Sequence, residues 1–177
     1  MLTEADTYEA VCRALVWDVP ALYNMGVAVC DRHADADPGR TALIYENESG
    51  DVAQYSFLAL KRLSNKLANL LAAKGLERGD RVGILLPQSV ETGVAHVALW
   101  KSGLVSLPLF TPFGEDALKY RLEDSGARAL ITDVDNLPKI EAIRDALPGL
   151  ETVLVTGAGK DGQGFADLWR GLDAADD

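Results

Sequence analysis

The sequence has no long apolar run, and this absence excludes a membrane-spanning helix. No stretch approaches the roughly 18 uninterrupted apolar residues that such a helix needs. The first residues include Glu4, Asp6 and Glu9, whereas a signal peptide begins with basic residues and an apolar run. We therefore expect a chain without a membrane span, in a reducing, cytoplasmic compartment.

Basic residues are scarce relative to acidic ones. The 177 residues include 17 Lys and Arg against 27 Asp and Glu, which gives a net charge of −10 and a pI near 4.6. Nucleic acids and anionic membranes bind to basic faces. The charge therefore argues against a nucleic-acid partner, and it identifies no other partner.

Cysteine and histidine are too few and too scattered for a recognisable reactive or metal-binding arrangement. Cys12 and Cys30 have no CxxC spacing, which favours buried apolar thiols over a disulfide or a metal site. His33 and His96 complete no nucleophile–base arrangement, because no serine or cysteine motif accompanies them. We expect His33 on a surface helix and His96 as a half-buried structural residue. No metal ligand and no catalytic residue is predicted.

The sequence does contain enough apolar material for a folded core. Hydrophobic residues make up 48% of the chain, and the mean hydropathy is +0.02. A chain of this length is typical of one globular domain. Trp17, Trp100 and Trp169 are scattered along it, and we predict that they are packing residues.

The spacing of apolar residues changes along the chain. Residues 1–40 are predicted to be helical, with a short helix over Val27–His33. Two runs of strand character, 41–45 and 52–55, flank turn-forming residues, and this pattern predicts a β-hairpin. From Ser56 onward, helical periodicity alternates with short apolar runs. The predicted helices cover about 56–74, 89–102, 114–125 and 137–147, and the predicted strands cover 82–86, 104–109, 128–132 and 152–155.

Short apolar strands that alternate with helices of about ten residues or more are typical of a parallel sheet with right-handed crossovers. The sequence therefore predicts the α/β class: a mainly parallel sheet with flanking helices, preceded by a β-hairpin. We divide the chain into a helical segment over residues 1–40, an α/β unit over residues 41–172 and an acidic segment over residues 173–177.

A glycine-rich segment, residues 157–162, matches G-x-G-x-x-G and follows a strand, as a dinucleotide-binding motif would. Such a motif also needs a helix that begins at the third glycine and a further strand. Only Gln163–Gly171 could form a short helix, and 152–155 is the last predicted strand. The segment also fails as a P-loop, because Asp161 stands where Ser or Thr would reach Mg²⁺. We interpret it as a solvated loop.

Five blocks of the sequence form a recognisable series: Tyr23–His33, Ser56–Val82, Leu85–Gln88, Ala98–Leu109 and Phe113–Asp133. Taken together and in this order, they resemble the adenylate-forming superfamily, in particular its acetyl- and medium-chain acyl-CoA synthetase branch. The resemblance extends over about 110 residues. Most of these blocks also have ordinary structural roles as turns and helix ends, so they indicate fold more than catalysis.

The resemblance implies a parent enzyme that uses ATP, Mg²⁺ and CoA to activate a carboxylic acid. In the family, a Thr/Ser/Gly-rich loop ending in Pro-Lys holds the phosphates, an Asp binds the ribose, and a Lys in a mobile C-terminal domain serves catalysis. None of these has a counterpart here. Asp173–Asp177 is similar to the acidic linker that precedes the phosphate loop, so we expect this chain to be the N-terminal part of such an enzyme, with no cofactor of its own.

One family site could lie in this chain. In CoA-forming members the loop after the second-block strand lies near the CoA nucleotide, and here that loop is Phe110, Thr111, Pro112, Phe113 and Gly114. A strand end that leads into a helix N-terminus is a suitable ligand site in an open sheet. The arginines that some members place after the next strand are missing from Asp133–Asn136, and only Lys139 is nearby.

Three function hypotheses follow. The first is the N-terminal portion of an acyl-CoA synthetase, which acts on a carboxylic acid together with the rest of its polypeptide and is inactive alone. The second is a non-catalytic α/β protein-interaction module. The third, a nucleotide-dependent oxidoreductase, rests only on residues 157–162. For the first hypothesis we expect the isolated chain to self-associate, because an uncovered apolar face or sheet edge is rarely tolerated in a monomer.

Overall fold

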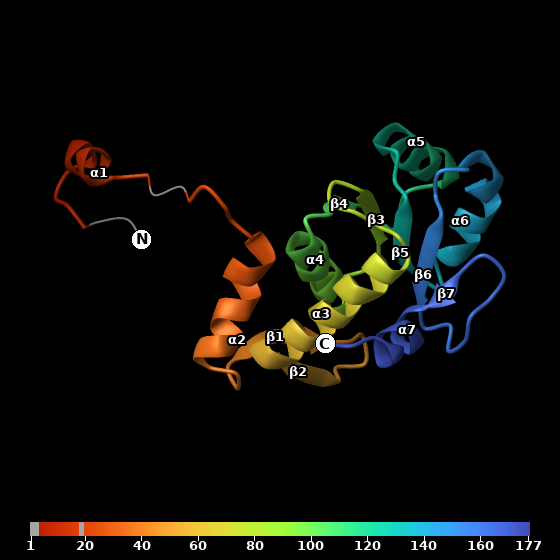
Figure 1. The fold of residues 1–177 in the computed structure, drawn as a ribbon, viewed down its shortest axis with the longest axis horizontal. Coiled ribbons are helices and arrows are strands. Elements are labelled where there is room, and N and C mark those ends of the chain that lie inside the picture. Colours follow the sequence, from red (N-terminus) through yellow and green to blue (C-terminus); the bar gives the residue numbers. More distant parts are fainter. Residues whose placement is uncertain (1–3, 18–19) are drawn as a thin grey trace.

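The computed structural model describes residues 4–17 and 20–177, and helical pieces precede the first strand (Figure 1). Thr7 caps helix α1, because its side chain accepts a hydrogen bond from the Ala10 amide at 3.2 Å. A π-helical turn, η1, continues into α2, and together they confirm the predicted short helix and extend it to Ala36. The bounds are Tyr8–Ala14 for α1, Val27–Asp31 for η1 and Arg32–Ala36 for α2.

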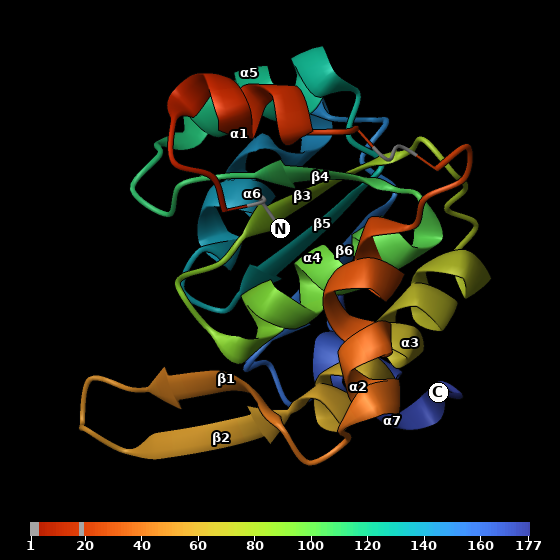
Figure 2. The same ribbon diagram turned by 90° about the vertical axis from the view of Figure 1, so that its left-hand side faces the viewer.

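The predicted hairpin is confirmed. Strands β1 (Thr41–Glu46) and β2 (Val52–Ser56) pair antiparallel and project beyond the main sheet (Figure 2). The side chain of Asn47 forms the turn, since its oxygen accepts hydrogen bonds from the amides of Ser49 at 3.0 Å and Asp51 at 2.8 Å. Such an Asx turn is one reason why asparagine is favoured between two strands.

The longest helices begin and end where the sequence indicates. Helix α3 (Phe57–Ala73) is capped by Ser56, and helix α4 (Val90–Ser102) by Ser89. Each serine side chain accepts a hydrogen bond from an amide in the first turn, which satisfies a donor that the helix leaves free. At the end of α4, Gly103 has φ +68°, a left-handed conformation that glycine adopts without strain.

The main sheet has the order β4-β3-β5-β6-β7, and its neighbouring strands are parallel. The four predicted strands are confirmed, with β5 in the centre. Helix α5 follows β4, and helix α6 follows β5. Helix α6 ends before the predicted residue 147, because a 3₁₀ turn, η2, covers Arg144–Ala146. The bounds are β3 Arg81–Leu85, β4 Val105–Pro108, β5 Ala129–Asp133, β6 Thr152–Thr156, β7 Ala166–Asp167, α5 Glu115–Ser125, α6 Leu137–Ile143 and α7 Leu168–Ala174.

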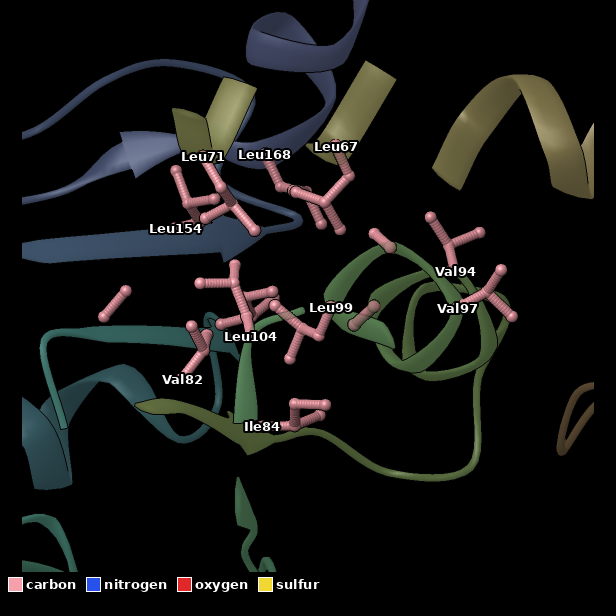
Figure 3. Close-up of a cluster of buried hydrophobic side chains, with 14 of the residues drawn as sticks. Leu67, Leu71, Val82, Ile84, Val94, Val97, Leu99, Leu104, Leu154 and Leu168 are labelled. Carbon is pink, nitrogen blue, oxygen red and sulfur yellow. The ribbon is translucent and has the colours of Figure 1, made fainter. Parts of the chain in front are cut away.

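The sheet separates two apolar clusters, with α3, α4 and α7 on one face and α5 and α6 on the other (Figure 1). Successive residues of β5 point to opposite faces, so Leu130 packs toward α5 and α6 whereas Ile131 packs toward α3 and α4. Figure 3 shows the larger cluster, in which leucines of α3, α4 and α7 meet Val82, Ile84 and Leu154 of the sheet. Both faces of the central strands are buried, as is usual for a parallel sheet.

The last part of the chain differs from the prediction. The residues Ala166–Asp167 form a further strand, β7, which pairs with β6. The helix expected over Gln163–Gly171 is α7, and it covers Leu168–Ala174. It begins later because the Asp167 carboxylate caps it and accepts a hydrogen bond from the amide of Arg170 at 2.9 Å. The helix therefore includes the first two residues of the acidic segment 173–177.

Two packing predictions are partly wrong. Cys30 is fully buried, but Cys12 is exposed on α1. Trp169 packs against the larger core cluster, whereas Trp17 is 81% exposed. Both exceptions belong to residues 4–17, which contribute none of the residues in the two clusters.

Candidate functional site: the carboxyl edge of the sheet

The residues singled out by the sequence lie where β4 and β5 end. Ligands of open α/β sheets bind in the crevice beyond the carboxyl ends of the strands. The loop Phe110–Gly114 leaves β4 at this edge, and Asp133–Asn136 leaves β5 there. The two strands are separated only by β3, so the topology brings together segments about 20 residues apart in the sequence.

The loop Phe110–Gly114 is an ordered turn. The Phe113 amide donates a hydrogen bond to the Phe110 carbonyl at 3.0 Å, and the two rings meet edge to face at 5.6 Å. The guanidinium of Arg121 lies over the Phe113 ring, 4.2 Å from its centroid. Phe113 is thus held in place, while the Phe110 ring is 71% exposed and available as a flat apolar surface.

Lys139 joins the two loops. Its ammonium donates hydrogen bonds to the Thr111 carbonyl at 2.6 Å and to the Asn136 side-chain oxygen at 3.0 Å. Asn136 is itself held by Asp133, whose carboxylate accepts from the Asn136 amide at 2.8 Å and from its side chain at 2.9 Å. The structure therefore brings Lys139 to the loop Phe110–Gly114, and its ammonium fastens that loop.

A cavity of about 500 Å³ lies beside this lysine, at the N-terminus of α5. Gly114, Glu115, Asp116 and Lys139 line it. The helix dipole and the ammonium attract an anion. The two carboxylates oppose that attraction, so this cavity is a poor site for a multiply charged phosphate.

A second cavity of about 350 Å³ lies on the other side of the loop, between the ends of β3 and β4 and helix α4. We call it the Phe110 groove. None of the residues that line it, all within the described range 20–177, is acidic. Its lining is mainly apolar and includes Ile84, Leu86, Pro108, Leu109 and Phe110, together with His96.

His96 is half-buried on α4, as expected, and its ring lies 5.5 Å from that of Trp100. Its Nδ1 atom is buried and has no hydrogen-bond partner among the described residues. Burial lowers the pKa of His96, because a charged imidazole is poorly solvated there. His33 lies exposed in α2, as predicted.

The glycine-rich segment 157–162 is not arranged as a dinucleotide site. The Gly159 amide, which would face a pyrophosphate, donates a hydrogen bond to the Asp167 carboxylate at 2.7 Å. Asp161 in turn accepts from the Asp167 amide at 2.8 Å. A further strand does follow, contrary to the prediction, but the third glycine, Gly162, opens no helix. The carboxylate of Asp167 occupies the place of an anionic ligand, and this argues against the oxidoreductase hypothesis.

The sequence predictions missed two of these arrangements. The Lys139–Thr111 contact joins residues 28 positions apart, and no local pattern indicates it. The role of Asp167 had a signal, because an aspartate before Leu168 and Trp169 is a typical N-cap. Within residues 4–17 and 20–177, no group of three or more His, Cys, Asp or Glu could hold a metal ion, and no helix is long and apolar enough to cross a membrane.

The fold and this edge define the class of the protein: an open, parallel α/β domain with its ligand-accessible edge at the carboxyl ends of the strands. Comparison with known proteins then gives the family. The AMP-binding enzyme family matches residues 30–170, and the chain belongs to this family.

Similar proteins are CoA ligases. The chain is 32% identical to the mitochondrial acyl-coenzyme A synthetase ACSM4 of Rattus norvegicus, over 85% of this chain and 27% of that protein. It is 37% identical to the acetyl-coenzyme A synthetase of Bacillus subtilis, over 76% of this chain and 23% of that protein. The crystal structure of a Brucella canis acyl-CoA synthetase matches with a TM-score of 0.81 and 25% identity, over 97% of this chain and 32% of that one. The chain thus spans about a quarter of the length of its curated relatives.

Proposed function

We propose that this chain is the N-terminal portion of an AMP-forming acyl-CoA synthetase and that it is inactive alone. In the proposed reaction a carboxylate attacks the α-phosphorus of ATP and releases pyrophosphate. The CoA thiol then attacks the acyl carbon, so that acyl-CoA forms and AMP leaves. The observation that supports this proposal is the family match over residues 30–170, combined with coverage of only 27% of a full-length relative.

The residues of this chain would contribute scaffold and positioning to that reaction. The sheet holds the loop Phe110–Gly114 at its carboxyl edge, and Lys139 fixes the loop from α6. ATP and Mg²⁺ would be held by the phosphate loop, ribose-binding Asp and catalytic Lys of the parent, which have no counterpart in this sequence.

For CoA we propose a contact at Phe110, Thr111, Pro112, Phe113 and Gly114. The exposed Phe110 ring suits stacking on a flat nucleotide base. The phosphates suit this site less well, because Glu115 and Asp116 share the cavity with the one lysine. We therefore place the adenine ring against the loop and the phosphates away from it.

Activity is tested with the purified chain, ATP, Mg²⁺, CoA and a panel of carboxylates from acetate to octanoate and benzoate. We expect no pyrophosphate release and no micromolar binding of ATP by calorimetry. A polypeptide that continues through the phosphate loop and the C-terminal domain should be active in the same assay. Turnover by the 177-residue chain itself would overturn the proposal.

The CoA contact is tested by titrating CoA into the isotopically labelled chain and following amide chemical shifts. We expect shifts of the amides of Phe110, Thr111, Phe113 and Gly114. Phe110→Ala should weaken the CoA affinity obtained from these titrations several-fold, because base stacking contributes about 1–3 kcal/mol. The matched control is Ile44→Ala, which removes another exposed apolar side chain at 69% exposure, on the hairpin. Equal titrations for Phe110→Ala and Ile44→Ala would remove the loop from the proposed CoA site.

A non-catalytic interaction module is the alternative, and the exposed apolar side chains near the N-terminus favour it. An activity assay of the longer polypeptide separates the two hypotheses. Formation of acyl-CoA by that polypeptide would favour the synthetase, whereas its failure to form acyl-CoA would favour the interaction module. A cytoplasmic location also stays a proposal, since the relatives include mitochondrial and bacterial proteins.

A further inference from the structure

A cavity of about 280 Å³ lies between α6 and the loop that joins β6 to β7, and Figure 1 shows this loop beside α6. From the side of α6 and η2 it is lined by Leu137, Ile140, Glu141 and Arg144, whose spacing i, i+3, i+4, i+7 places them on one face. We call it the Arg144 cavity. It shares no lining residue with the two cavities at the carboxyl edge of the sheet, so it is separate from the candidate CoA site.

The floor of the Arg144 cavity is apolar. Ile140 and Val153 are almost fully buried there, and Leu137 and Phe165 are half-buried and pack against the smaller core cluster. Small-molecule sites commonly combine such apolar walls with a few polar groups, in volumes from about 300 Å³ upward. The cavity lies at the lower end of that range and therefore suits a small ligand.

The glycines at the end of the glycine-rich segment shape the opposite wall. The Gly162 amide donates a hydrogen bond to the Phe165 carbonyl at 3.2 Å, and a side chain at Gly162 would collide with the Phe165 ring. Gly164, which lines the cavity, has φ +83°, a conformation that glycine adopts without strain. Residues 162–165 thus turn tightly around the Phe165 ring and hold it as one wall of the cavity.

Arg144 is a half-buried cation without a counter-ion in the described part of the chain. Its Nη1 atom is buried and has no hydrogen-bond partner there, and Nη2 donates only to the Glu151 carbonyl at 3.5 Å, a long and weak contact. The Glu151 carboxylate pairs with Arg128 instead, and Glu141 forms no ion pair with Arg144. Burial lowers the pKa of Arg144. A buried charge without a partner is costly, so an anion beside this guanidinium would be favoured.

We propose that the Arg144 cavity binds a small monocarboxylate with a short alkyl chain, whose carboxylate pairs with Arg144 and whose chain lies on Ile140 and Val153. A guanidinium can donate two parallel hydrogen bonds to one carboxylate. Because Nη1 is buried, the guanidinium has to rotate toward the cavity, and in doing so it gives up only the long contact to Glu151. The inference does not depend on the proposed enzymatic reaction, since neither ATP nor CoA takes part.

The balance of charge and apolar surface favours this class of ligand over other anions. One guanidinium opposed by the Glu141 carboxylate suits a single negative charge better than a multiply charged phosphate. Glu141 is exposed, so water and salt screen its repulsion of the ligand. The apolar floor suits an alkyl chain, because each methylene group that leaves water adds to the affinity.

The first test titrates alkyl carboxylates from butanoate to decanoate into the chain with labelled Ile, Leu and Val methyl groups, followed by NMR. We expect saturable shifts at Ile140 and Val153 and none at the exposed Ile44 of the hairpin. The affinity should rise about fourfold for each added methylene until the cavity is full. Shifts that do not saturate, or that are as large at Ile44 as at Ile140, would overturn the proposal.

The second test separates the charge from the apolar floor, with octanoate as the probe. Arg144→Gln should weaken binding about tenfold or more, whereas Glu141→Gln should tighten it by removing a like charge from the cavity. A purely structural disturbance would not tighten binding. The control Arg170→Gln makes the same change of charge at an exposed residue of α7 outside this cavity and should leave the affinity unchanged.

The sign of the ligand charge gives a last check. Octan-1-amine has the same chain length and the opposite charge, so it should bind more weakly than octanoate. Equal affinities of octanoate for wild type and Arg144→Gln, or tighter binding of the amine than of octanoate, would contradict the proposed site.

Discussion

The two edges of the sheet use charge in opposite ways. At the amino edge Arg128 pairs with Asp80 at 2.6 Å and with Glu151 at 2.7 Å, so each charged group has a partner of opposite sign. At the carboxyl edge Lys139 and Asp133 bind neutral groups of the loops, and cavities lie beside them. The amino edge is thus built for stability, whereas the carboxyl edge is held in shape and keeps room for a ligand.

The largest expected effect comes from the core that both edges share. Leu130 lies on the central strand and is fully buried, so Leu130→Ala should lower the free energy of unfolding by about 2–5 kcal/mol. Urea unfolding followed by circular dichroism measures it. The control Val105→Ala changes an edge-strand residue that is 48% exposed, and it should stay within about 0.5 kcal/mol of wild type. Similar losses in the two variants would mean that the core is not centred on β5.

Breaking the amino edge should have the next largest effect. Arg128→Leu removes both ion pairs and leaves the Asp80 carboxylate, which is 16% exposed, without its main cation. We expect lower stability than wild type but a smaller loss than for Leu130→Ala, because Arg128 is near solvent. The double variant Arg128→Leu/Asp80→Leu should recover part of the loss in a double-mutant cycle. No recovery would show that the pair contributes nothing beyond its separate residues.

Acid should weaken the amino edge selectively. The hydrogen bond from the Glu77 amide, and then the Arg128 guanidinium, lower the pKa of Asp80 below its ordinary value. A carboxyl with a lowered pKa in the folded state stabilises the protein above the unfolded-state pKa of about 3.9, and this contribution is lost as the pH falls through and below that value. Asp80→Asn should therefore be less stable than wild type at pH 7, and the gap should close toward pH 3. The exposed Asp145, changed to Asn, serves as the control in urea unfolding. A gap that is constant with pH would contradict the role of the Asp80 charge.

The smallest effect on stability, and the most local one, is expected at the carboxyl edge. Lys139→Met keeps an apolar stem but removes the hydrogen bonds to Thr111 and Asn136. We expect a global loss of about 1 kcal/mol or less, together with faster hydrogen exchange of the Phe113 amide as the loop loosens. Lys119→Met, on α5, is the control. Unchanged exchange at Phe113 would show that packing alone, without Lys139, holds the loop.

The sequence predicts elements that carry their own start and stop signals. Ser56, Ser89 and Gly103 mark helix ends by local chemistry, and the structure confirms them. Strand β7 has only two residues and no alternating pattern, so its pairing with β6 depends on contacts across space. The candidate site is a similar case. The sequence predicts which loop forms it, but the hydrogen bond between Lys139 and Thr111 that holds this loop joins residues distant in the sequence and is evident only from the structure.

The burial of Cys30 has a practical consequence. Desolvation in the packed interface between η1 and α3, together with the neighbouring Asp31, raises the pKa of this thiol to about 11. An alkylating reagent at neutral pH should therefore modify the exposed Cys12 promptly and reach Cys30 only when this region transiently opens. The rate at which Cys30 is alkylated then reports how often this region opens, and the rate of Cys12 alkylation in the same molecules serves as the internal standard.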